Sequence, residues 1–185
     1  MTRFKLSSLA QAVAICASAL LFVGNAAAAG DKAAYEQAKA SAKAAYETDK
    51  KACDSLSGNA KDICVAEAKA KRTKVDEDAE AAYKGTPKAR EHAVHEIAEA
   101  NYQVAKERCD DKTGNDKDVC IKEAKAAMTK AQADAKATKT GTEARMDANK
   151  DKREADYKVA AEKCDALAGD AKSACVASAK ARYGK

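Results

Sequence analysis

The sequence predicts an all-α protein: an up-down array of about six helices, paired into disulfide-stapled hairpins around a thin, alanine-rich core. Three observations support this prediction. A phrase in which Tyr is followed at fixed spacing by Cys-Asp, Gly, Lys and a second Cys occurs three times with a period of about 55 residues, which indicates one structural unit used three times. Alanine, the best helix former, supplies most of an apolar fraction of 46%. Glycine-containing joints separate long stretches that lack helix breakers.

Residues 1–29 have the pattern of a cleaved, Sec-type signal peptide. Positive residues at the start are followed by a short apolar run over residues 9–23, and then by small residues that allow cleavage after Ala28 or Ala29. The apolar run is short for a membrane span, so we expect no membrane insertion after the peptide is removed. Cys16 leaves with the peptide, and the mature chain is expected to be periplasmic.

Charge on the expected mature chain is abundant but evenly mixed. Arg3 and Lys5 lie in the signal peptide, so the formal net charge of +5 falls by two when the peptide is removed. Such a balanced surface has no strong field to attract nucleic acid or an anionic membrane, and we expect neither as a partner. Large aliphatic side chains are scarce and Trp is absent, so the helices should be strong while the hydrophobic core stays thin.

A first kind of joint lies inside each Cys phrase, between its two cysteines. A Gly at this place can end a helix in the left-handed conformation, and the polar residue after it can cap the N-terminus of the next helix. The three joints of this kind are Gly58-Asn59, Gly114-Asn115 and Gly169-Asp170.

A second kind of joint lies between the phrases. Gly85-Thr86-Pro87 supplies a C-terminal Gly, an N-capping Thr and a Pro at the first helical position, where its missing N–H costs nothing. Gly141-Thr142 stands at the equivalent place without the Pro. Together the joints delimit three repeats, over residues 30–85, 86–141 and 142–185, of which the third is shortened. They predict helices over residues 31–57, 60–84, 87–113, 116–140, 143–168 and 171–183.

Six cysteines remain after signal cleavage, in three equally spaced pairs. In an exported protein this pattern favours a disulfide framework over a thiol metal site or a redox switch, and the spacing matches no CxxC motif, haem site or zinc knuckle. If the chain reverses at the Gly inside each phrase, both thiols lie about one and a half turns from the bend and within disulfide range. The predicted disulfides are Cys53–Cys64, Cys109–Cys120 and Cys164–Cys175.

The alternation of the two joints predicts where these disulfides lie. Helices of equal length that reverse at every joint place all three disulfides at one end of a compact array. The alternative is three stapled hairpins strung loosely on open Gly-Thr joints. In either case Tyr46, Tyr102 and Tyr157 share a helix stripe with the first Cys of their phrase, and we expect them to pack along the hairpin seam.

The only two histidines in the sequence, His92 and His95, form a candidate metal site with Glu99. A spacing of three puts both imidazoles on one helix face with the carboxylate one turn further, and such groups can hold Zn²⁺, Ni²⁺ or Cu²⁺ weakly. The corresponding stretch of the next repeat has no His, so a solvated helix face is the favoured interpretation and the metal site is the alternative.

Catalysis finds no support in the sequence. The acidic residues are dispersed along exposed helices without the apolar surroundings that raise a carboxyl pKa, and neither a Gly-rich phosphate loop nor a nucleophile elbow is present. We therefore predict a non-enzymatic protein that has no cofactor.

Long helices rich in Ala, Lys, Asp and Glu behind a signal sequence resemble the helical middle domain of the TolA family of envelope-spanning proteins. The phrase Cys-Asp…Gly…Lys…Cys is, through all three copies, more similar to exported proteobacterial Ala/Lys-rich proteins that are often labelled TolA-like. The chain departs from TolA itself in its Cys-stapled joints, so TolA's partners are not carried over. The resemblance implies a place in the cell envelope, but no activity and no functional residues.

These observations together predict a structural or protein-interaction role in the periplasm, related to envelope stress, with an envelope protein or a cell-wall component as partner. The alternatives are a periplasmic protein that binds a divalent metal through His92 and His95, and a hydrophilic protectant that shields other proteins under stress.

Overall fold

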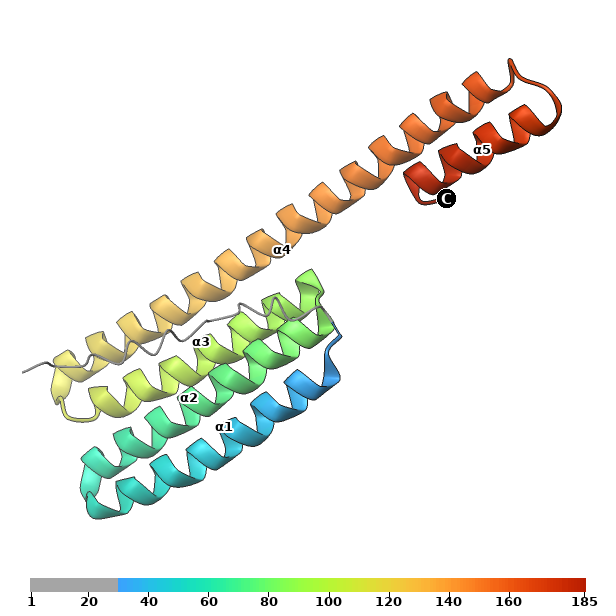
Figure 1. Ribbon diagram of the computed structural model, residues 1–185. Helices are drawn as coiled ribbons and strands as arrows, with labels where there is room; N and C mark the ends of the chain where they lie inside the picture. Colours follow the sequence, from blue (N-terminus) through green and yellow to red (C-terminus); the bar gives the residue numbers. More distant parts are fainter. Residues whose placement is uncertain (1–29) are drawn as a thin grey trace, which may run out of the picture.

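The computed structural model describes residues 30–185, and the regular elements in this range are helices only (Figure 1). The all-α prediction is confirmed. A short 3-10 turn, η1 (Cys53–Ser55), follows the first of five α-helices. The helices are α1 (Lys32–Ala52), α2 (Gly58–Lys84), α3 (Pro87–Cys109), α4 (Gly114–Cys164) and α5 (Gly169–Tyr183). The predicted signal peptide and Cys16 lie outside the described residues.

The joint inside each Cys phrase contains a glycine with positive φ, as predicted, but this Gly begins the next helix instead of ending the preceding one. The φ angles of Gly58, Gly114 and Gly169 are +57°, +57° and +58°, a region that residues with a side chain rarely adopt. The predicted cap was wrong. In the first joint the extended N-cap residue is Ser57, which precedes the Gly, and Asn59 is already part of α2. The Asn59 side chain makes a contact with α3 instead.

The joint between α2 and α3 follows the prediction. Gly85 ends α2 with a φ of +62°, and Pro87 is the first residue of α3. Thr86 is extended, and its hydroxyl oxygen accepts a hydrogen bond of 3.1 Å from the backbone N–H of Ala89. Because Pro disfavours helical backbone at the residue before it, the helix has to break at this point.

The predicted joint at Gly141-Thr142 is wrong, since α4 runs through it as one helix of 51 residues. Glu143 stands where the first joint has Pro87, so nothing in this stretch forces the backbone out of the helix. The hydroxyl of Thr142 donates to the carbonyl of Thr138 at 2.8 Å and caps no new helix. A single Gly costs a helix only about 1 kcal/mol relative to Ala. Residues 30–185 therefore contain five α-helices, one fewer than predicted.

The helices α1, α2, α3 and the first part of α4 lie side by side in a layer (Figure 1), and only consecutive helices of the described chain pack together. α4 continues beyond this layer, and α5 folds back along its far end. The disulfides Cys53–Cys64 and Cys109–Cys120 therefore lie at one end of the layer, whereas Cys164–Cys175 lies at the far end of α4. The predicted clustering of all three disulfides at one end is wrong, because α4 does not reverse at Gly141.

The core is as thin as the composition predicts. Among residues 30–185 no polar or charged residue is buried. Val104 is the only large aliphatic residue in this range that is buried. All the other buried residues are alanines and cysteines, with Ala42, Ala68 and Ala93 each less than 5% exposed. Small side chains let the helices approach closely but bury little apolar area for each residue. Covalent and polar contacts between helices consequently carry more of the stability than in an ordinary domain.

Candidate functional site

Each Cys phrase forms a tight corner that is closed by a disulfide, as predicted. The Cα–Cα distance is 5.7 Å and the sequence separation is 11 residues in all three bonds. The first cysteine of each pair, Cys53, Cys109 or Cys164, is almost completely buried. A disulfide across so short a loop contributes about 3 kcal/mol. This is a large share of the net stability of a small folded unit.

The Asp and Lys of the phrase form an ion pair across each corner. The distance from the Lys Nζ to the Asp Oδ1 is 2.9 Å in all three copies, Lys61–Asp54, Lys117–Asp110 and Lys172–Asp165. The pairs are more than a third exposed, so each adds at most about 1 kcal/mol, and their role is to orient the corner. Sequence reasoning recorded both residues but missed their pairing, although their constant spacing in all three copies was an available signal.

The first two corners are tied to each other through Asn59. Its side-chain amide donates to the backbone carbonyl of Glu107 at 2.9 Å and to the carboxylate of Asp111 at 2.7 Å. About two turns further along α2, Glu67 pairs with Arg108 of α3 at 2.5 Å. These contacts fix the register of α3 on α2, and they join residues that are far apart in the sequence.

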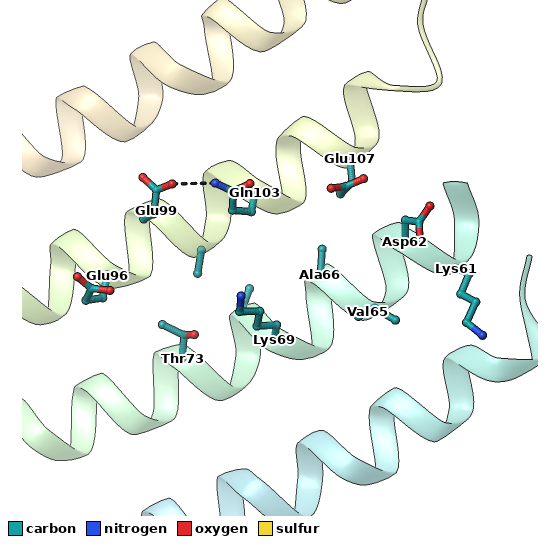
Figure 2. A pocket seen from close by; sticks show the side chains of 12 residues that line it. Lys61, Asp62, Val65, Ala66, Lys69, Thr73, Glu96, Glu99, Gln103 and Glu107 are labelled. Atoms are coloured by element: carbon teal, nitrogen blue, oxygen red, sulfur yellow. Dashed lines mark hydrogen bonds between the residues drawn. The ribbon is translucent and has the colours of Figure 1, made fainter. Parts of the chain in front are cut away.

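An open groove of about 500 Å³ runs between α2 and α3. Figure 2 shows that side chains of both charges line it, among them Lys69 from α2 and Glu96 and Glu99 from α3. The amide of Gln103 donates to the Glu99 carboxylate at 2.8 Å. None of these groups is buried, so the groove holds solvated charges and lacks the desolvated carboxyl that acid–base catalysis needs.

The structure places the three predicted metal ligands in different surroundings. His92 lies near the α2–α3 joint, with its Nδ1 3.3 Å from the Oε2 of Glu77, whereas Glu99 lines the groove of Figure 2. His95 is half-buried and close enough to Glu91 to help lower the pKa of that carboxyl. No three or more His, Cys, Asp or Glu side chains within residues 30–185 are arranged to hold a metal ion. The metal site stays a prediction that metal titration can test.

Equivalent positions of the first two hairpins carry different contacts. Tyr35 of α1 stacks on Tyr83 of α2, with the ring centroids 5.0 Å apart. The repeat puts Glu91 and Lys139 at the same two positions of α3 and α4, where they form an ion pair of 2.9 Å. The hydrogen bond between them lowers the pKa of Glu91 and raises the pKa of Lys139. At this position α1 and α2 are therefore held together by aromatic stacking, whereas α3 and α4 are held together by an ion pair.

The third hairpin stands apart from the layer. Every residue over 143–153 is exposed, so this part of α4 packs on no other helix of residues 30–185. Beyond it α5 packs on the end of α4, and Lys185 reaches Glu154 at 3.2 Å, which lowers the pKa of that carboxyl. Tyr157 is half-buried at the seam, as predicted, with the Lys185 ammonium 5.9 Å from its ring centroid.

No family model, curated protein or solved structure matches the chain. None of the helices described for residues 30–185 is long and apolar enough to cross a membrane. The three disulfides are of the kind that persists in oxidising compartments. Residues 30–185 form an extended framework with stapled corners and a surface of mixed charge.

Proposed function

We propose that the protein is a non-enzymatic helical spacer of the cell envelope, with a structural or protein-interaction role in the periplasm. The observation that carries this proposal is the length of the continuous helix α4. Its 51 residues extend over about 75 Å, with the layered helices at one end and a stapled hairpin at the other. A rod of this length can hold two contact points apart at a fixed distance.

The corners at the two ends supply the contact points. Leu56 in the first corner and Leu167 in the third occupy equivalent positions, and they are 42% and 44% exposed. The second corner has Lys112 at this position. Exposed leucines at the tips of the molecule favour binding of a partner at its ends, since apolar surface is the main source of affinity at the centre of an interface.

The proposal is tested by site-specific photo-crosslinking in cells. A photoreactive residue is placed at Leu56 or Leu167, and in a matched control at Met146, which is 56% exposed in the middle of α4. We expect adducts with envelope components from the two corner positions and none from Met146. Fractionation of the protein outside the periplasm would contradict the proposed location, and the absence of corner adducts in the envelope fraction would contradict the proposed role.

A further inference from the structure

One face of α4 is uncovered along most of the length of the helix. The side that carries Ala135 and Cys164 packs on α3 and α5, and both residues are buried. The helical period places a second set of residues on the opposite side of the same helix. These residues, called the free face below, are Asn115, Val119, Glu123, Ala126, Ala137, Ala148, Ala155 and Val159. All of them are exposed, and the exposed fractions of Val119 and Val159 are 44% and 56%.

The repeat identifies what normally covers this face. Val104, the counterpart of Val159 in the preceding repeat, is only 8% exposed because it packs at the α2–α3 interface. Ala81 and Ala93 are buried, while their counterparts Ala137 and Ala148 are exposed. The residues that α2 and α3 use to pack on each other are thus retained in the two halves of α4, where they have no neighbour. The segment that fits residues 114–140 is therefore another helix with the sequence of residues 142–164.

Some of the charged and polar contacts between α2 and α3 also have counterparts in α4. Glu67 and Arg108, which pair across that interface, correspond to Glu123 and Lys163 of α4, and the opposite charges are kept. Asn59, which donates to the Glu107 carbonyl and the Asp111 carboxylate, corresponds to Asn115. Glu162 takes the place of Glu107, whereas Ala166 takes the place of Asp111 and offers no side-chain acceptor. The two halves of α4 are consequently complementary in charge as well as in shape.

A straight helix cannot fold its own two halves together, but two antiparallel copies can pair the first half of one with the second half of the other. The register of the α2–α3 interface, transferred to α4, puts the two-fold axis of such a pair at Gly141. We propose that two copies of this chain associate through their free faces as an antiparallel, two-fold symmetric dimer. This goes beyond the proposed spacer role, which one copy can fill.

Each end of the dimer then contains the six-helix order that the sequence predicts, with the last two helices supplied by the partner copy. This is the relation found in domain swapping, in which an element packs on a second copy as it otherwise packs within one chain. The interface departs from its template at Lys152, which replaces the half-buried Ile97, and at Ala133 and Asp147, which replace the paired Glu77 and His92. An interface with one large aliphatic fewer and alanines elsewhere should exchange between dimer and monomer.

The first test is the mass of the protein, purified with its disulfides intact, by sedimentation velocity over a wide range of concentration. We expect a monomer–dimer equilibrium whose dissociation constant rises at least about tenfold in Val159→Asp, because the charge falls in the interface. Met146→Asp is the matched control: Met146 is also 56% exposed on α4 but lies off the free face, so its dissociation constant should stay unchanged. Equal effects of the two substitutions would overturn the proposal.

A second test uses the charge pair. Glu123→Lys and Lys163→Glu should each weaken the dimer several-fold, while the double variant should restore it, since the opposite charges face each other again. Both side chains are exposed in the single chain, so neither substitution disturbs its fold. A protein that is monomeric at every concentration, whether extended or closed on itself, overturns the proposal, as does a polymer larger than two copies. None of these outcomes bears on the envelope crosslinks that test the spacer role.

Discussion

The joints Gly85-Thr86-Pro87 and Gly141-Thr142-Glu143 occupy equivalent places in two repeats, yet the first is a sharp reversal and the second is the middle of a straight helix. They share Gly and Thr and differ at one position that decides the outcome. A Gly permits a helix to end and a Thr can cap the next one, but neither residue forbids the helix to continue. Pro87 does, because it lacks the N–H and restricts the residue before it.

The largest expected effect comes from giving the second joint its missing proline. In Glu143→Pro the substitution removes a helical hydrogen bond and costs α4 about 3 kcal/mol or more. We expect α4 to break next to Gly141, with the third hairpin folding back onto residues 114–140. Small-angle scattering should then show a clearly smaller maximum dimension, and the proposed dimer should give way to a monomer of six helices.

Glu143→Ala controls for the loss of the carboxylate and should leave the scattering profile as it is. If Glu143→Pro keeps the full length of the rod, Pro87 is not what separates the two joints, and the comparison fails.

A second difference between the regions concerns their disulfides. Within the described chain α5 packs only on α4, whereas the corner of α3 and α4 is also held by Asn59. Loss of either disulfide removes about 3 kcal/mol. Cys164→Ser/Cys175→Ser should therefore unfold α5, while Cys109→Ser/Cys120→Ser should leave α3 and α4 helical. Hydrogen exchange of the backbone amides, measured separately for each helix, tests this prediction. Equal loss of protection in the two double variants would contradict it.

The two glycines should respond to the same substitution with opposite signs. Gly85 has a φ of +62°, so Gly85→Ala should destabilise the protein by about 1–2 kcal/mol. Gly141 is helical, and a Cβ added to it meets no atom within 4 Å, so Gly141→Ala should stabilise α4 by about 0.5–1 kcal/mol. Denaturant unfolding of dilute, monomeric protein measures both changes, and a destabilising Gly141→Ala would argue against a continuous helix.

The smallest expected effect is a pH dependence of stability that the Glu91–Lys139 ion pair should have and the Tyr35–Tyr83 stack should lack. The pKa of Glu91 is lowered by Lys139, so the stabilisation from this pair is present above the unfolded pKa of a Glu, about 4.3, and is lost as the pH falls through the folded value. The pKa of Lys139 is raised, so the same stabilisation is lost again only in strong alkali.

Glu91→Gln should therefore lower the unfolding midpoint at neutral pH and leave it unchanged in acid. Tyr83→Phe, at the stacked position of the first hairpin, should show no such acid dependence. Parallel pH profiles for wild type and Glu91→Gln would mean that the ion pair does not contribute.

Most local features of this fold could be predicted from the sequence because they depend on neighbouring residues. The disulfides followed from the spacing of Cys53 and Cys64 around Gly58, and the break at Gly85 followed from Pro87. The continuity of α4 could not be predicted from Gly141 and Thr142 alone, because these two residues permit a joint without requiring one.

The contacts of Asn59 were also beyond sequence reasoning. Its side chain was assigned to a local cap, whereas its partners, Glu107 and Asp111, lie in another repeat. Nothing local distinguishes a capping Asn from one that bridges two helices. The free face of α4 was likewise invisible, since it became evident only when exposed and buried copies of one residue, such as Val159 and Val104, were compared.

A core built from alanine and cysteine also determines how the free energy of unfolding depends on temperature. The heat capacity of unfolding grows with the apolar area that unfolding exposes. Helices that meet through Ala42, Ala68 and Ala93 expose little of it, so the curve of stability against temperature should be shallow and broad. The free energy of unfolding of such a protein should fall only slowly on warming and change little on cooling.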